Sequence, residues 1–368
     1  MKITRISVYQ KDLPLADPYW LSGGRLKFEV LDATFVKLDT DAGLTGWGEG
    51  TPWGHTYVPA HGPGIRAGIE TMAPAVLGQD PRMNELVERA MDLCLPGHLY
   101  AKAPVDLACW DIMGKACGLP IADLLGGKRE TGTPAASSVS SGDPDYMMDI
   151  INRYREWGYM AHSAKVGGDV DHDIVRIRHI EANRKPGEII LYDVNRAWTR
   201  REAGIVMNAV ADLGVTFEQP GETLDDIAEI RKVTTSPISV DETLVTLQDA
   251  CRIARDGIAD VFGIKLNRVG GLTKARRMRD VALAHGIQMF VMATGGSVMA
   301  DTEAAHLAQS VPQEFIRASW SCQDMLTVDV APGRGCRTKN GILTVNDTPG
   351  LGCDPDEAIL GDPVAVYE

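Results

Sequence analysis

The sequence predicts an α/β fold: a (β/α)7β TIM-type barrel with an α+β N-terminal capping domain that the C-terminal tail completes. After about residue 130, short apolar runs alternate with amphipathic helical stretches, and there are eight such runs. Eight parallel strands favour a closed barrel. An open doubly wound sheet would need a glycine-rich phosphate loop after its first strand, and the sequence has none.

The eight predicted barrel strands are rich in β-branched residues and are separated by helices with recognisable starts. Thr223 with Asp226, and Thr246 with Asp249, resemble capping boxes in which Asp takes the usual place of Glu. Asp143 precedes Pro144, which is typical of a capped first turn. The strands are expected at 133–139, 160–166, 189–195, 215–220, 237–242, 261–266, 288–293 and 316–319.

The N-terminal part has a different pattern. Residues 3–9 alternate apolar and polar side chains, residues 28–38 do so more loosely, and residues 45–49 follow a turn, so a small antiparallel sheet is expected. Helices are expected at 66–77 and 102–117. The tail after about residue 326 lacks the strand–helix rhythm and is expected to pack on this sheet. The predicted boundaries are 1–125 for the capping domain, 126–325 for the barrel and 326–368 for the tail.

Composition excludes several classes of function. The formal net charge is −13 and the chain is 44% apolar, which argues against binding to nucleic acid or an anionic membrane. Charges interrupt every apolar stretch near the N-terminus, and no apolar window is long enough to span a membrane. The seven cysteines form no Cys-x-x-Cys pair, which indicates reduced thiols and a cytoplasmic protein without a zinc site.

Ionisable residues stand where the predicted barrel strands end, which is where barrel enzymes place their active sites. Asp193, Glu218 and Asp241 end three successive runs. Three carboxylates at close range repel unless a cation lies among them, and oxygen ligands without His or Cys favour Mg²⁺. The alternative is that each carboxylate caps a loop or pairs with an arginine.

Two lysines, Lys165 and Lys265, end the second and sixth runs on either side of these carboxylates. Buried amines near a metal can act as bases on opposite faces of one carbon. This pattern indicates removal of the α-proton of a metal-bound carboxylate, followed by racemisation or by loss of a β-hydroxyl. The alternative is a pair of structural salt bridges to the same carboxylates.

The whole chain resembles the enolase superfamily, and within it the muconate-lactonizing-enzyme-like subgroup. The resemblance implies that Asp193, Glu218 and Asp241 bind Mg²⁺ and that Lys165 and Lys265 are the acid/base pair. The motifs that carry it are Gly-Trp-Gly-Glu at 46–49, Asp-Leu-Ala-Cys-Trp-Asp at 106–111, Leu-Leu-Gly-Gly at 124–127, Asp193, Glu-Gln-Pro at 218–220, Asp-Glu at 241–242 and Lys-Leu-Asn-Arg-Val-Gly-Gly at 265–271.

Two departures narrow the expected activity. Ser163 stands where the subgroup usually has the first lysine of Lys-x-Lys, and residues 293–296 lack the acidic residue that many relatives carry. Ser163-x-Lys165, with Pro-Tyr-Trp at 18–20 and Trp-Gly-His at 53–55, resembles the cis-3-hydroxy-L-proline dehydratase branch. That resemblance implies Mg²⁺-dependent dehydration to Δ1-pyrroline-2-carboxylate, in which Lys265 takes the α-proton and Lys165 assists departure of the hydroxide, or the reverse.

The expected partner is a small amino-acid substrate, and a homo-oligomer is expected. Tyr19, Trp20, Trp53 and Tyr57, with His55, are expected to close over the site from the capping loops. The residues predicted to contact substrate are Ser163, Asn195, Thr294, Trp20, Tyr57 and His55.

Three other functions remain open. An epimerase or racemase of a proline betaine or another amino-acid derivative would use the same residues. A sugar-acid dehydratase would normally need a His-Asp pair on the late strands, and no histidine ends the seventh run. A non-catalytic metal-binding protein would have no use for two lysines facing the cation.

Overall fold

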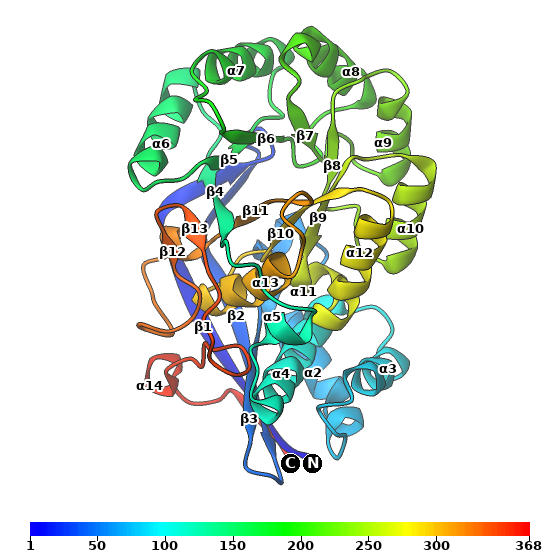
Figure 1. Ribbon diagram of the computed structural model, residues 1–368, viewed down its shortest axis with the longest axis vertical. Coiled ribbons are helices and arrows are strands. Elements are labelled where there is room, and N and C mark those ends of the chain that lie inside the picture. The colour runs from blue at the N-terminus through cyan, green and yellow to red at the C-terminus, as the bar shows by residue number, and fades with distance from the viewer.

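Eight parallel strands form a closed barrel in the computed structural model, which describes all 368 residues (Figure 1). Each strand pairs with the next along the chain, and β11 pairs with β4 to close the ring. Every predicted run contains one of these strands, within a few residues. The strands are β4 (Thr133–Val139), β5 (Ala161–Lys165), β6 (Ile189–Asp193), β7 (Thr216–Glu218), β8 (Ile238–Val240), β9 (Val261–Lys265), β10 (Gln288–Met292) and β11 (Ile316–Trp320).

Helices connect successive strands and surround the barrel (Figure 1). Seven long connecting helices between eight strands confirm the predicted (β/α)7β order. A short helix, α11 (Leu266–Val269), lies directly after β9, before the connecting helix of that unit. The long connecting helices are α6 (Pro144–Glu156), α7 (Val170–Ala182), α8 (Arg200–Ala209), α9 (Leu224–Arg231), α10 (Leu247–Asp256), α12 (Leu272–Ala284) and α13 (Val298–Gln309).

The predicted helix starts are largely confirmed. Thr223 with Asp226, and Thr246 with Asp249, form capping boxes at the starts of α9 and α10. Asp143 is the N-cap of α6, but its side chain makes no capping hydrogen bond, so the prediction of a capping side chain there is wrong. Pro144 alone provides the favourable first turn, because its fixed φ suits a helix start.

The N-terminal sheet has the order β14-β1-β2-β3 and lies against the barrel (Figure 1). Strand β1 (Ile3–Leu21) is much longer than the run predicted at 3–9. Its register against β2 (Leu26–Thr40) shifts between Pro14 and Tyr19. This shift interrupts the alternation of apolar and polar side chains by which a strand is recognised in a sequence. The other elements of this part are β3 (Thr45–Gly50), α1 (Gly54–Tyr57), α2 (Gly62–Val76), α3 (Asn84–Cys94), α4 (Leu99–Cys117) and α5 (Ile121–Leu124).

The C-terminal tail contacts both parts of the protein. The hairpin of β12 (Thr338–Lys339) and β13 (Ile342–Leu343) pairs with β4 of the barrel. After α14 (Glu357–Leu360), strand β14 (Ala365–Tyr367) pairs with β1. The tail therefore packs on the N-terminal sheet, as expected, and also extends the barrel sheet.

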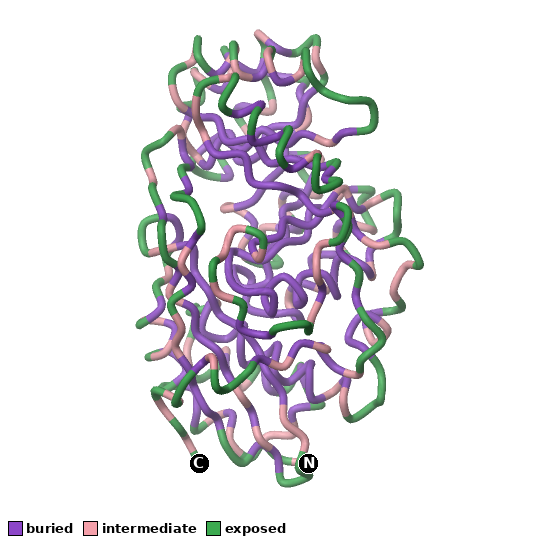
Figure 2. Tube along the Cα trace, turned by 90° about the vertical axis from the view of Figure 1, so that its left-hand side faces the viewer, coloured by how far each residue is buried: buried purple, intermediate pink, exposed green.

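One continuous core joins these parts. A cluster of 105 buried hydrophobic residues includes side chains of the N-terminal sheet, the barrel and the tail, and buried backbone runs through the middle of the molecule (Figure 2). None of the helices combines the length and apolar character that a membrane crossing requires. All seven cysteines are free thiols.

Candidate active site

The carboxyl ends of the barrel strands bring together the predicted ionisable side chains. Lys165, Asp193 and Glu218 are the last residues of β5, β6 and β7, and the strand register places them side by side. Asp241 follows β8, and Lys265 ends β9. All five side chains are buried, so their charges interact through a medium of low dielectric.

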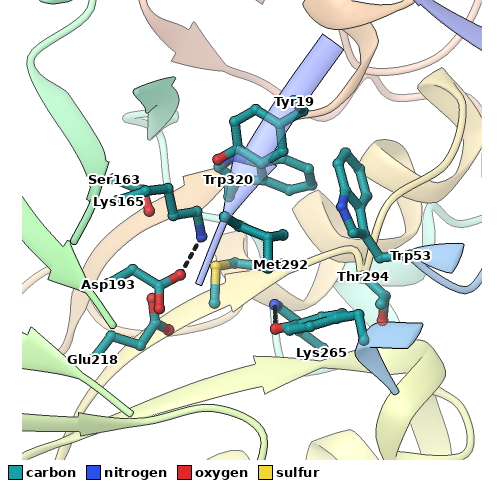
Figure 3. A pocket seen from close by; sticks show the side chains of 12 residues that line it. Tyr19, Trp53, Ser163, Lys165, Asp193, Glu218, Lys265, Met292, Thr294 and Trp320 are labelled. Atoms are coloured by element: carbon teal, nitrogen blue, oxygen red, sulfur yellow. Dashed lines mark hydrogen bonds and ion pairs between the residues drawn. The ribbon is translucent and has the colours of Figure 1, made fainter. Parts of the chain in front are cut away.

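Lys165 and Lys265 line one pocket and reach into it from different strands (Figure 3). Lys165 forms an ion pair with Asp193. Burial lowers the pKa of Lys165, but Asp193, Tyr19 and Glu218 together outweigh burial and raise that pKa above its ordinary value. Lys165 is therefore held as an ammonium group, which can donate a proton.

Asp241 lies beside Lys265 among three hydrogen-bond donors. Its Oδ2 atom lies 2.7 Å from the Lys265 Nζ and accepts a hydrogen bond of 3.0 Å from the Tyr57 hydroxyl. Its Oδ1 atom pairs with the guanidinium of Arg268. Burial alone would raise the pKa of Asp241, but Arg268 and Lys265 lower it well below its ordinary value. Asp241 is therefore ionised.

Asn195 lies behind the carboxylates and orients them. Its backbone N–H donates to the Asp193 Oδ1 at 3.0 Å, and its side-chain Nδ2 donates to Asp193 Oδ2 at 3.1 Å and to Glu242 Oε1 at 3.2 Å. The backbone of Asn195 has φ of 46°, a left-handed conformation that Asn tolerates better than most residues. Asn195 thus fixes the position of Asp193.

Aromatic rings form the opposite wall of the pocket (Figure 3). Trp53 packs edge-on against both Tyr19 and Trp320, with ring centroids 5.5 Å apart in each pair. All three rings are buried. The Tyr19 hydroxyl and the Trp53 Nε1 have no hydrogen-bond partner, so both can bind a polar group of a ligand.

The chain matches two family models that together cover most of its length. Residues 4–126 match the N-terminal domain of mandelate racemase and muconate lactonizing enzyme, and residues 147–359 match the enolase C-terminal domain-like family. The chain belongs to the enolase superfamily. This confirms the resemblance drawn from the motifs and identifies the protein as an enzyme of that superfamily.

Similar proteins of this superfamily include different activities. The cis-3-hydroxy-L-proline dehydratase of Roseibium aggregatum is 41% identical over 368 residues, which cover all of both chains. The N-succinyl-L-Arg/Lys racemase of Bacillus cereus is 31% identical over 84% of this chain and 85% of its own.

Solved structures share the fold over the full length. A mandelate racemase/muconate lactonizing enzyme-type protein of Silicibacter pomeroyi is 68% identical, with a TM-score of 0.97, over 100% of this chain and 99% of that one. An enolase-superfamily protein of Roseovarius nubinhibens, solved with magnesium, is 49% identical with a TM-score of 0.96 over the same shares of the two chains.

The oxygen atoms at the barrel mouth fit a hard divalent cation. Glu218 Oε1 is buried without a hydrogen-bond partner. Burial, together with the charges of Asp193 and Asp241, raises the pKa of Glu218 well above its ordinary value. A cation would satisfy this oxygen and relieve the repulsion, and carboxylates without His or Cys suit Mg²⁺.

The predicted convergence of three carboxylates is only partly seen. Asp193 and Glu218 line the pocket, but Asp241 does not, and no three His, Cys, Asp or Glu side chains form a ready ligand group. The physical reason is that Asp241 is drawn toward Lys265 and Arg268. The salt bridges that the sequence left open as an alternative do form, yet both lysines also line the pocket.

The predicted substrate contacts divide into two groups. Ser163, Thr294 and Tyr57 line the pocket. Asn195, Trp20 and His55 do not. Asn195 lies behind Asp193, and His55 is exposed on α1. Trp20 is 39% exposed and packs near Lys27, because neighbouring residues of a strand face opposite sides and its neighbour Tyr19 faces the pocket.

Three residues that line the pocket escaped prediction. Leu21, Met292 and Trp320 contribute apolar walls. Trp320 ends β11, one residue beyond the predicted run, so the rule that strand ends carry the site could have found it. Met292 ends β10 and could have been found by the same rule. Leu21 has no such signal, because it lies outside the barrel and apolar side chains in strands usually belong to the core.

Proposed function

We propose that the protein dehydrates cis-3-hydroxy-L-proline to Δ1-pyrroline-2-carboxylate with Mg²⁺ as cofactor. The observation that carries the proposal is the pair of amines, Lys165 and Lys265, lining one pocket beside Ser163. The full-length similarity to a cis-3-hydroxy-L-proline dehydratase supports the choice of substrate.

The proposed Mg²⁺ ligands are Asp193, Glu218 and Asp241. When bound, the cation supplies positive charge that makes the α-proton of a coordinated carboxylate more acidic and stabilises the negative charge that follows its removal. Asn195 keeps Asp193 in place through its two hydrogen bonds.

The elimination needs a base and an acid on opposite faces of the ring. In the cis isomer the hydroxyl lies on the carboxylate side, so the α-hydrogen lies on the other face. The Lys265 Nζ takes the α-proton, and the electron pair of the C–H bond becomes the C2=C3 double bond. The C3–O bond breaks, and the Lys165 ammonium donates a proton so that the oxygen leaves as water.

The product of this step is an enamine, which tautomerises to the cyclic imine. Both lysines pair with an aspartate, Lys165 with Asp193 and Lys265 with Asp241, so the reverse assignment would use the same two amines.

The aromatic wall provides recognition of the substrate ring. The secondary ammonium of hydroxyproline is a cation, and the faces of Tyr19, Trp53 and Trp320 can bind it by cation–π interaction. Ser163 leaves room for the ring, because it is small, and places no positive charge near that nitrogen, as a lysine there would.

A second candidate is epimerisation of an amino-acid derivative. Two lysines on different sides of one α-carbon also suit removal and return of a proton, and the N-succinyl-L-Arg/Lys racemase is a relative. Dehydration is favoured by the higher identity and full coverage of the dehydratase.

The test is a substrate panel with the Mg²⁺-loaded enzyme. It comprises cis- and trans-3-hydroxy-L-proline and a proline betaine, and imine formation is followed by trapping with o-aminobenzaldehyde. We expect imine from the cis-3 isomer alone. Imine from none of them, with a changed configuration of the betaine, would show that the epimerase is correct instead.

A further inference from the structure

The hydroxyl of Tyr57 lies where the capping part of the protein meets the ionisable side chains of the barrel. Tyr57 ends the short helix α1, is 4% exposed and lines the catalytic pocket. Its hydroxyl donates a hydrogen bond of 3.0 Å to the Asp241 Oδ2 and accepts one of 3.4 Å from the Lys265 Nζ. The Lys265 Nζ lies 2.7 Å from the same Asp241 oxygen, so the three groups form a closed triangle.

The directions of these hydrogen bonds limit what the Tyr57 hydroxyl can do. An ionised carboxylate only accepts hydrogen bonds, so the single phenolic proton points to Asp241. A lone pair of the same oxygen accepts from Lys265. The proton is therefore not free to bind a substrate, although the ring of Tyr57 is a wall of the pocket.

Arg196, which follows the barrel strand β6, holds Tyr57 in this position. Its Nη2 atom donates to the Tyr57 carbonyl at 2.6 Å, and its guanidinium carbon lies 5.9 Å from the centroid of the Tyr57 ring. The Lys265 Nζ lies 5.5 Å from the same centroid. Both distances are within the range of cation–π interactions. Two barrel cations and Asp241 thus fix the ring and the hydroxyl of Tyr57 together.

A lysine that acts as a base needs such support, because its amine is at the end of a flexible four-carbon chain. Misplacing a reacting group by 1 Å can lower the rate by about 10²-fold. The Lys265 Nζ has two neighbouring oxygens in the triangle, one from Asp241 and one from Tyr57. Two contacts restrict the position of Nζ more than the ion pair with Asp241 would alone.

We propose that Tyr57 is a positioning residue, whose hydroxyl holds Asp241 and Lys265 in the arrangement that removes the α-proton. The hydroxyl acts through these two side chains and does not bind the substrate. Asp241 is also a proposed Mg²⁺ ligand, and loss of a hydrogen bond that orients a metal ligand typically lowers metal affinity by about 10- to 100-fold. The proposal rests on the roles proposed above for Asp241 and Lys265.

The first test is Mg²⁺ binding to Tyr57→Phe, which removes only the hydroxyl, by isothermal titration calorimetry without substrate. Tyr9→Phe is the matched control, because Tyr9 is also 4% exposed and its hydroxyl also donates at 3.0 Å to a carboxylate, that of Glu357, outside the pocket. We expect Tyr57→Phe to raise the Kd for Mg²⁺ about tenfold or more, and Tyr9→Phe to leave it unchanged. The wild-type Kd in Tyr57→Phe would overturn the proposal.

The second test is turnover of cis-3-hydroxy-L-proline, with hydrogen or deuterium at its α-carbon, at saturating Mg²⁺. We expect Tyr57→Phe to lower kcat about tenfold with little change in KM, and to increase the isotope effect on kcat, because a displaced base slows proton removal. A raised KM with an unchanged kcat and isotope effect would overturn the proposal and show that the hydroxyl binds substrate. No turnover by the wild type would refute the proposed reaction instead, and the Mg²⁺ titration would still decide the role of Tyr57.

Discussion

Lys165 and Lys265 are the residues on which the proposed chemistry depends. Each ends a barrel strand, lines the pocket and pairs with an aspartate. A structural role and a catalytic role therefore predict different results when the amine is removed. Loss of a salt bridge alone lowers stability, whereas loss of an acid or base lowers kcat.

We expect Lys165→Ala and Lys265→Ala each to lower kcat by a factor of about 10² to 10⁴, the range typical of a general acid or base. The measurement is steady-state turnover of cis-3-hydroxy-L-proline with saturating Mg²⁺. Lys274→Ala is the control, because Lys274 is also paired with an aspartate but lies outside the pocket. Full turnover by both pocket variants would refute the acid/base pair.

His306, a buried histidine that does not line the pocket, provides a test of how burial changes a pKa. It is fully buried on α13, its Nδ1 accepts from the Ala122 backbone N–H at 3.1 Å, and its Nε2 lies 3.0 Å from the Leu351 carbonyl. Burial lowers the pKa of His306 from 6.5 to about 4. The ring is therefore neutral in the folded protein.

The unfolded chain binds a proton at this residue below pH 6.5, and the folded chain does not until about pH 4. The contribution of His306 to the free energy of unfolding is thus full above pH 6.5 and is lost as the pH falls toward 4, by up to about 3 kcal/mol. Urea unfolding of wild type and His306→Gln should give a difference that shrinks over this range. A constant difference would contradict the neutral ring.

At the scale of elements, the connection between β3 and α13 holds the loop that carries Thr294. Glu49, at the end of β3, accepts hydrogen bonds from the backbone N–H groups of Ser297 at 2.9 Å and Ala300 at 3.2 Å. It also accepts from the hydroxyls of Ser297 and Thr51. A buried carboxylate at a helix N-terminus is favourably placed, because the free N–H groups there need acceptors.

We expect Glu49→Gln to lower the free energy of unfolding by about 1–3 kcal/mol, since an amide cannot accept from all these donors and leaves some unsatisfied. Chemical denaturation measures the change. Glu70→Gln, an exposed substitution on α2, is the control and should change stability by less than about 0.5 kcal/mol. Equal stability of Glu49→Gln and wild type would show that Glu49 does not hold α13.

Comparison of the predicted and observed elements shows which features could be predicted from the sequence. The barrel strands and Lys165, Asp193, Glu218 and Lys265 were predictable, because short apolar runs that end in charged residues are typical of barrel strands with a site at their carboxyl ends. The sequence could not show which aromatic residue of β1 faces the site. The register of β1 against β2 shifts between Pro14 and Tyr19, so simple alternation assigns the wrong faces after the shift.

The path of the chain after β9 explains why the ion pair between Arg268 and Asp241 was not predicted. Arg268 was predictable only as part of a motif, since its ion pair with Asp241 depends on the short helix α11 turning it back toward the barrel. Asp241 is displaced from the other carboxylates by this contact and by Lys265. A pattern of residue types along a sequence does not show which lysine or arginine will pair with a given carboxylate.

At the scale of the whole molecule, one core joins the N-terminal sheet, the barrel and the tail. The tail pairs with β1 and with β4, so neither part is complete without it. The domain boundaries predicted from the sequence stay a prediction, as does the homo-oligomer.

We expect a single cooperative unfolding transition, because separating the parts would expose this shared core. Urea unfolding followed by far-ultraviolet circular dichroism and by tryptophan fluorescence should give coincident curves. Two separated transitions would show that the capping domain and the barrel unfold independently.

The most direct test of the proposed reaction is proton NMR of cis-3-hydroxy-L-proline with the Mg²⁺-loaded enzyme in D₂O. We predict that the substrate signals disappear as those of Δ1-pyrroline-2-carboxylate grow, and that the remaining substrate carries no deuterium at its α-carbon. Deuterium entering the recovered substrate, with no imine formed, would contradict the dehydration.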